Sequence, residues 1–100
     1  MPAYLVVDIT VKDAATYDQY RRLAPPSIAL YGGRYLARGG ETAVLEGDWK
    51  PTRLVILEFP TLEKAKAWWA SPEYAEAKAL RQRAASADIV LIEGAASPAG

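Results

Sequence analysis

The chain has 100 residues, the size of one domain, and its 12 lysines and arginines balance its 12 aspartates and glutamates. A formal charge of zero argues against nucleic-acid binding and against a polybasic membrane contact, because both need a basic surface. The sequence also lacks cysteine, histidine and asparagine. These absences exclude disulfides, thiolate nucleophiles, histidine bases and histidine-ligated haem or zinc. A magnesium or calcium site made of carboxylates alone stays open, but no EF-hand spacing is present, and we expect neither a cofactor nor a metal site.

The first pattern along the chain is a strand. Residues 3–10 (AYLVVDIT) are short, apolar and rich in β-branched side chains, which is typical of a β-strand. No basic leader and no long apolar run accompanies it, so we expect no signal peptide, no membrane span and a cytoplasmic protein.

A helix is predicted next. Asp13 has the side chain of a helix N-cap, and apolar residues recur every three or four positions from Ala14 onward. The pair Pro25-Pro26 lies inside this apolar stripe. Proline removes a backbone donor and clashes with the preceding turn, so we expect the helix to break or kink near Ala24 and restart. Gly32-Gly33 is expected to end it.

The segment RYLAR at 34–38 predicts a second strand. Regular alternation places Arg34, Leu36 and Arg38 on one face and the two residues between them on the other. Residues 39–52 then read as an excursion from the sheet, because glycine pairs and a proline interrupt a short apolar run.

The second half of the chain repeats the pattern of strand, helix and strand. Residues 53–59 (RLVILEF) are nearly all apolar, which predicts a central strand covered on both faces. Thr61 is the expected N-cap of a second helix, and Ser71-Pro72 marks a fresh helix start. A last strand is predicted at 87–94, and residues 96–100 form a small-residue tail expected to be flexible.

The order β-α-β-β-α-β within residues 1–95 predicts a single ferredoxin-like α+β domain. We expect an antiparallel four-stranded sheet of order 4-1-3-2 with two helices on one face. The opposite face of the sheet is still apolar, since only Asp8 and Glu58 interrupt the first and third strands. A face this apolar predicts a homodimer joined sheet to sheet, and the alternative is a monomer with a partly apolar sheet.

Several stretches together carry a resemblance to a known family: GGRYLARGG, LEGDWKPTRLVILEFP, AKAWWASPEYAEAKALRQRAA and a closing VLIEG. They resemble domain-of-unknown-function family 1330, of the dimeric α+β barrel superfamily, over residues 3–94. The resemblance implies a ferredoxin-like fold and a dimer but no particular reaction. The superfamily includes cofactor-independent monooxygenases, muconolactone isomerases, stress-responsive barrel proteins and haem enzymes, and its ligands usually bind between the sheet and the helices. This chain lacks the histidine of the haem proteins and the asparagine that some of the monooxygenases use.

The arginines of the second strand are the first candidates for a binding site. In the antiparallel order, Arg34 should lie near Glu58, while Arg38 should lie near Arg53 and Asp8. One interpretation is a pocket wall whose guanidiniums clamp a carboxylate or an enolate. The other is a set of structural ion pairs across strands or across a dimer, which is favoured because such pairs cluster in the same way.

Aromatic side chains on the two helices are the second set of candidates. If their rings face the sheet, Tyr17 and Tyr74 line an apolar cavity with phenol groups at its mouth. Helical spacing favours a core position for Tyr17, Tyr20 and Trp69. Trp68 and Trp69 point about 100° apart on a helix, so one of them should lie near a surface, a pocket rim or a partner chain.

Asp8 and Glu58 could also act as general bases, because burial in an apolar strand raises the pKa of a carboxyl group unless an arginine offsets it. The charged side of the last helix reads as a solvated face, from which Arg81 is set apart by its apolar neighbours. We expect a pocket for a small organic acid or aromatic molecule, in a binding protein or cofactor-independent enzyme; the alternative is a non-catalytic structural or stress-associated dimer filled by its own aromatics. The candidate ligand-binding residues are Asp8, Tyr17, Arg34, Arg38, Glu58, Trp69 and Tyr74.

Overall fold

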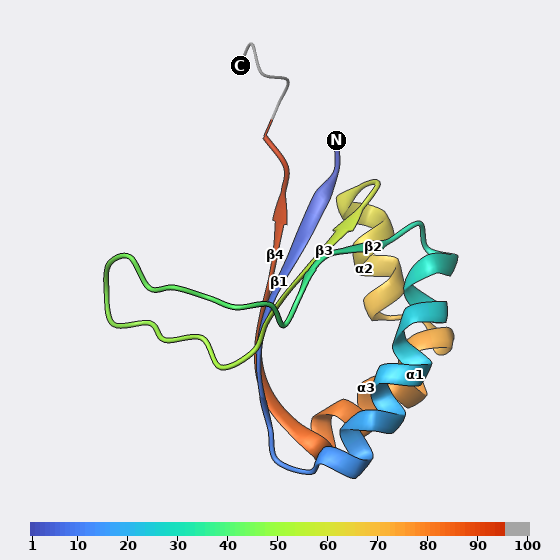
Figure 1. Ribbon diagram of the computed structural model, residues 1–100. Coiled ribbons are helices and arrows are strands. Elements are labelled where there is room, and N and C mark those ends of the chain that lie inside the picture. The colour runs from blue at the N-terminus through green and yellow to red at the C-terminus, as the bar shows by residue number, and fades with distance from the viewer. Residues whose placement is uncertain (96–100) are drawn as a thin grey trace.

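The computed structural model describes residues 1–95 and shows one antiparallel sheet with helices packed on a single face (Figure 1). The strands are β1 (Ala3–Val11), β2 (Arg34–Arg38), β3 (Leu54–Phe59) and β4 (Ala85–Glu93). They lie in the order β2-β3-β1-β4, with every neighbouring pair antiparallel. The predicted ferredoxin-like topology is therefore confirmed. The predicted tail 96–100 lies outside the described residues.

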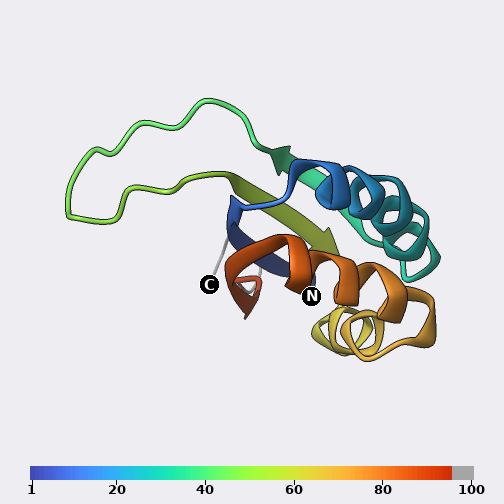
Figure 2. The same cartoon turned by 90° about the horizontal axis from the view of Figure 1, so that it is seen from below.

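Three helices cover the sheet rather than two: α1 (Ala14–Leu30), α2 (Leu62–Trp69) and α3 (Pro72–Ala84) (Figure 2). The second helical region is divided at Ser71, as its N-cap chemistry predicts. Ser71 Oγ accepts from the backbone N–H of Tyr74 at 3.2 Å and donates to the carbonyl of Trp68 at 2.7 Å. One side chain thus caps the start of α3 and the end of α2. No helix within residues 1–95 combines the length and the apolar character that crossing a bilayer requires.

Alternation along the strands separates a buried face from an open one. Every second residue of β1 and β3 points toward the helices and is buried, whereas the residues between them are partly exposed on the opposite face. The two central strands are therefore covered on one face within this chain, not on both. The core on the helix side includes Leu5, Val7, Ile9, Ile28, Val55, Leu57, Phe59, Trp68 and Tyr74.

The predicted break at the prolines of α1 does not occur. The helix runs without interruption through Pro25 and Pro26. Pro25 has no N–H for the carbonyl of Arg21 four residues earlier, and Arg38 Nη2 lies 3.5 Å from that oxygen as a weak donor. Ser27 Oγ also donates to the carbonyl of Ala24 at 2.7 Å. The Arg38 side chain thus lies where Pro25 removes a backbone donor.

A β-bulge changes the expected faces of the second strand. Tyr35 lies opposite Leu57, but Ala37 lies opposite Ile56, so Leu36 is an extra residue in the ladder. Arg38 consequently lies opposite Val55 and faces the helices. The prediction that Arg34 and Arg38 share one face was wrong, because alternation assumes a strand without bulges.

Residues 39–53 form a long arm that extends from the sheet on the side away from the helices (Figure 1). Its base is held by Asp8, whose carboxylate accepts from Trp49 Nε1 at 3.0 Å and from the backbone N–H groups of Thr52 and Arg53 at 2.9 and 3.3 Å. The rest of the arm is exposed to solvent. This is the excursion that the glycines and the proline predict.

Candidate functional site: an arginine-lined cavity between sheet and helices

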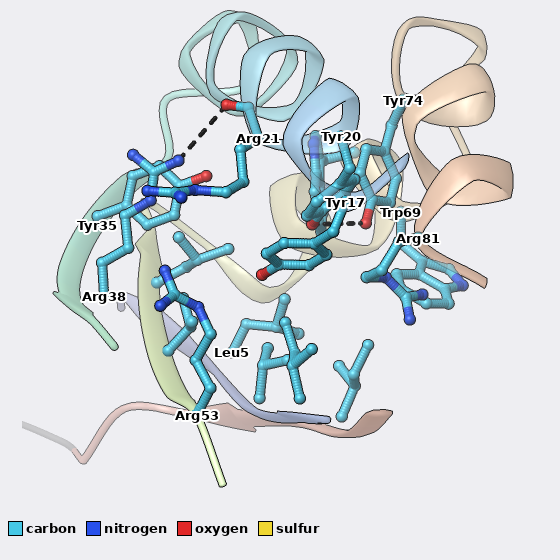
Figure 3. Close-up of a pocket in the computed structure, with 16 residues that line it drawn as sticks. Leu5, Tyr17, Tyr20, Arg21, Tyr35, Arg38, Arg53, Trp69, Tyr74 and Arg81 are labelled. Atoms are coloured by element: carbon cyan, nitrogen blue, oxygen red, sulfur yellow. Dashed lines mark hydrogen bonds between the residues drawn. The ribbon is translucent and has the colours of Figure 1, made fainter. Parts of the chain in front are cut away.

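A cavity of about 30 Å³, room for a few water molecules, lies between the sheet and the helices (Figure 3). Its floor consists of aliphatic side chains of β1, β3 and β4, and its roof of tyrosines and tryptophans from the helices. Four arginines also line it, and no aspartate or glutamate of residues 1–95 does. The arginines are Arg21, Arg38, Arg53 and Arg81, and the tyrosines are Tyr17, Tyr20, Tyr35 and Tyr74.

The roof is a cluster of tyrosines joined by ring contacts and one hydrogen bond. The hydroxyl groups of Tyr20 and Tyr74 lie 3.2 Å apart, and the rings of Tyr17 and Tyr20 have centroids 5.5 Å apart. Burial raises the pKa of Tyr20 well above its ordinary value of 10, and the neighbouring Tyr74 raises it further. The Tyr20 phenol therefore stays neutral and can donate a hydrogen bond at any physiological pH.

Two arginines enter the cavity from the sheet beside the arm. The Arg38 guanidinium lies over the ring of Tyr35, 4.3 Å from its centroid. Arg53 Nε is buried and has no hydrogen-bond partner among the described residues. Gly39 makes room for this side chain. Its φ of +70° lies in the left-handed region that favours glycine, and a Cβ at this position would come within 2.6 Å of Arg53 Cζ.

Arg81 enters from α3 and is the most buried charged side chain of the cavity. It is 4% exposed, and its Nε has no hydrogen-bond partner within residues 1–95. Its guanidinium lies 5.9 Å from the ring centroid of Trp69, at the limit of a cation–π contact. The ion pairs among the described residues join Arg21 to Asp18 at 3.8 Å and Arg34 to Glu58 at 2.8 Å, so Arg21 is the cavity arginine that has a carboxylate partner. Within residues 1–95, Arg81 has no carboxylate to balance its charge.

Four of the seven predicted ligand-binding residues line this cavity: Tyr17, Arg38, Trp69 and Tyr74. The other three lie on the open face of the sheet. Arg34 and Glu58 form an ion pair there, with Arg34 Nε donating to Glu58 Oε1 at 2.8 Å. This pair confirms the expected proximity of the two residues.

Asp8 also lies on the open face, near the start of β3 as predicted, but no arginine side chain is its partner. It accepts from an indole and two backbone N–H groups instead. The Trp49 hydrogen bond is the largest cause that lowers the pKa of Asp8 below its ordinary value of 3.8. The raised pKa expected of a general base was therefore wrong for Asp8.

One of the two adjacent tryptophans is buried and the other lies near a surface, as expected, but the buried one is Trp68 and not Trp69. Trp68 is the core residue, 1% exposed, and its Nε1 donates to Ser27 Oγ at 3.1 Å. Trp69 is partly exposed and lines the cavity. The prediction of a core position for Trp69 was wrong, because helical spacing does not show which side of a stripe meets the sheet.

Several cavity residues were not among the predicted ligand-binding residues, although the sequence held a signal for Arg53, Arg81 and Tyr35. Arg53 is two positions before the buried Val55 and therefore shares its face of the sheet. Arg81 follows Tyr74 by seven residues and precedes Ala84 by three, so it occupies the buried stripe of α3. Tyr35 faces the cavity for the same reason as Arg53. Only Arg21, from the exposed side of α1, had no such signal.

The family of the chain follows from its sequence. The model of DUF1330, a domain of unknown function, matches residues 2–95. The chain belongs to this family. No curated protein matches it in sequence.

Solved structures share the fold of this DUF1330 chain at low sequence identity. A protein of unknown function from Rhodopseudomonas palustris has a TM-score of 0.76 and 21% identity, over 95% of this chain and 83% of the other. SnoaB, a cofactor-independent oxygenase from Streptomyces nogalater, has a TM-score of 0.67 and 13% identity, over 97% and 96% of the two chains. A dimeric protein of ferredoxin-like fold from Bacteroides fragilis has a TM-score of 0.58 and 14% identity, over 93% and 96%. These likenesses establish the fold.

Proposed function

We propose that this protein binds a small organic acid with a flat apolar body in the cavity between the sheet and the helices. The observation that carries the proposal is Arg81, which is 4% exposed and faces a cavity that no carboxylate of residues 1–95 lines. Arginine does not lose its proton in proteins, so the charge remains. A buried charge without a partner costs on the order of several kcal/mol, which a bound carboxylate would offset.

The rest of the cavity supports the same class of ligand. A guanidinium binds a carboxylate through two parallel hydrogen bonds, and the phenols of Tyr20 and Tyr74 offer further donors at the roof. The aliphatic floor and the aromatic roof favour a planar, apolar body between them. The free space of about 30 Å³ is too small for such a ligand, so binding must move side chains at the rim, of which Arg38 and Trp69 are the more exposed.

The experiment is thermal unfolding of the protein with benzoate, salicylate and naphthoate, each compared with its neutral amide. A ligand at a hundred times its dissociation constant adds about 2.7 kcal/mol to the free energy of unfolding, which is on the order of 10 °C for a domain of this size. We expect the acids to raise the melting temperature and the amides to leave it unchanged.

Two matched variants control this experiment. Arg81→Gln should abolish the shift, because it removes the buried guanidinium. Arg83→Gln removes an exposed charge from the same helix and should preserve the shift. Acids that give no shift, or a shift that survives Arg81→Gln, contradict the proposal.

Catalysis is a separate outcome of the same search. The Streptomyces protein is described as a cofactor-independent oxygenase. If dioxygen were consumed when an acid is added to this protein, the proposal would extend from a binding protein to an enzyme. The cavity itself offers guanidiniums and neutral phenols but no carboxylate of residues 1–95 as a base. These groups favour binding, and we propose no reaction.

A non-catalytic dimer with a filled interior is the second candidate. The small size of the cavity favours it, since the tyrosines and Trp69 already occupy most of the space. This candidate requires that no acid shifts the melting temperature, so the experiment above separates the two functions.

We also propose that the protein acts as a homodimer joined through the open face of the sheet. On that face Val90 and Ile92 are 63% and 57% exposed, and on the adjacent arm Leu45 and Trp49 are 94% and 58% exposed. A stable dimer needs an interface of about 800 Å² on each partner, which an uncovered sheet together with an arm can provide. The arm would then lie against the second copy.

A further inference from the structure

The cationic side chains of the cavity form two groups at opposite ends of it. Figure 3 shows Arg21, Arg38 and Arg53 gathered at one end and Arg81 beside Trp69 at the other. The first end is built by β2 and the start of β3, near one edge of the sheet, together with α1. The second end is built by α3. The tyrosine roof and the aliphatic floor lie between them.

Each end holds a guanidinium nitrogen that lacks a partner. The Nε atoms of Arg53 and Arg81 are both buried, and within residues 1–95 neither has a hydrogen-bond partner. Most buried polar atoms in proteins are hydrogen-bonded, so two such atoms in one cavity require an explanation. The two atoms belong to different elements, and one carboxylate at either end would leave the other guanidinium unpaired.

The pKa values of two tyrosines are affected by different groups of arginines. Burial is the main cause that raises the pKa of Tyr20, and Arg81 is the arginine that opposes the rise. Burial also raises the pKa of Tyr35, and there Arg38 is the main opposing charge. The two groups of arginines therefore act on different phenols.

We infer that the ligand is a dianion, a molecule with an acidic group at each end and a flat apolar centre. One acidic group meets Arg53 with Arg38, the other meets Arg81, and the centre lies between the tyrosines and the aliphatic floor. The inference rests on the proposed function and narrows its ligand from an organic acid to a diacid. Two separated carboxylates can pair with both guanidiniums whose Nε atoms are buried, whereas a single carboxylate cannot.

The test compares diacids with their half-amides, which have the same shape and one charge fewer. The probes are benzene-1,4-dicarboxylate and naphthalene-2,6-dicarboxylate, each with its half-amide, and binding is measured by titration calorimetry on the whole chain. We expect the better diacid to bind at least about tenfold more tightly than its half-amide, because each charge-assisted pair contributes that much or more.

Variants then assign the two ends. Arg53→Gln should weaken the diacid to about the affinity of the half-amide and should affect the half-amide itself little, since the single carboxylate of that ligand stays on Arg81. Arg81→Gln should weaken the diacid at least as much, and it should weaken the half-amide as well. Arg83→Gln, an exposed change on α3, should leave both affinities unchanged. A cooperative thermal transition of each variant verifies that it folds.

The outcomes distinguish the inference from the proposed function. A half-amide that binds the unmodified protein as tightly as its diacid overturns the dianion, while the proposed binding of an acid stands. A diacid that is weakened by only one of the two arginine substitutions also overturns it. If neither diacids, half-amides nor simple aromatic acids bind, both the inference and the proposed function fail.

Discussion

At the residue scale, Gly39 decides where an arginine can lie. Its φ of +70° is a conformation that side chains disfavour, and a Cβ at this position would meet the Arg53 guanidinium. We expect Gly39→Ala to lower the free energy of unfolding by about 1–2 kcal/mol and to weaken acid binding, because Arg53 must move. Urea unfolding and calorimetry measure the two effects.

Gly40→Ala is the matched control, since a Cβ there meets nothing within 4 Å. It should change stability by less than about 0.5 kcal/mol. Equal effects of the two substitutions would show that Gly39 does not shape the position of Arg53.

Asp8 is predicted to make the free energy of unfolding depend on pH under acidic conditions. Hydrogen bonds from Trp49 and two backbone N–H groups lower its pKa below 3.8, so its charged form stabilises the folded state. This contribution is complete above about pH 5 and is lost as the pH falls through the folded pKa. The stability advantage of the unmodified protein over Asp8→Asn should therefore be constant between pH 7 and 5 and shrink below about pH 4. Urea unfolding at several pH values measures it, and an advantage that grows on acidification would contradict the assignment.

At the element scale, the Arg38 side chain of β2 lies near a carbonyl of α1 that has no helical donor. In α1, Arg38 lies 3.5 Å from the carbonyl of Arg21 that Pro25 leaves without a helical donor. In β2, the bulge at Leu36 turns Arg38 toward the helices, where it can reach that carbonyl. The bulge therefore orients Arg38 toward the carbonyl that Pro25 leaves without a donor.

Ser71 joins two helices, and its removal should destabilise both ends that it caps. Ser71→Ala leaves the N–H of Tyr74 without its cap, which typically costs about 1 kcal/mol. Because Ser71 is buried, water cannot easily replace the lost partner. We expect a loss of about 1–2 kcal/mol in denaturant unfolding.

Ser86→Ala is the control for this change, since Ser86 is exposed on β4. It should alter stability by less than about 0.5 kcal/mol. A Ser71→Ala variant as stable as the control would show that α2 and α3 do not depend on the shared cap.

At the scale of the whole molecule, the arm makes the chain less compact than its length requires. The radius of gyration is 14.1 Å, compared with about 13 Å for a compact domain of this length. An arm with exposed Leu45 and Trp49 beside an uncovered sheet face gains little free energy in an isolated chain. Both features are accounted for if a second copy covers them, as proposed above.

Dimerisation is therefore predicted to depend on the arm and the open face. Leu45→Asp and Val90→Asp should each raise the dissociation constant of the dimer about tenfold or more, because a charge replaces apolar area in the interface. Sedimentation velocity over a range of concentrations measures this.

Leu30→Asp is the matched control, because Leu30 is 70% exposed at the end of α1, on the helix side of the sheet. It should leave the dimer intact. An unmodified protein that sediments as a monomer at micromolar concentration would contradict the dimer.

The sequence by itself determined the order of the strands and helices and the residues that cap the helices. These features depend on contacts between residues close in the chain, since Asp13, Thr61 and Ser71 cap helices that begin at the next residue. Which face of β1 and β3 is buried was not determined in this way, because both strands are apolar at nearly every position. The same local rules correctly brought Arg34 to Glu58, because register follows from strand order.

Only the tertiary structure decided the composition of the site. The bulge at Leu36 moved Arg38 to the cavity, and packing of α2 chose Trp68 for the core and Trp69 for the rim. The Nε atoms of Arg53 and Arg81, buried and without a partner within residues 1–95, could not be foreseen, because a missing partner is a property of everything around a side chain. A cavity is made by residues distant in the chain, and its chemistry is set by which of them meet there.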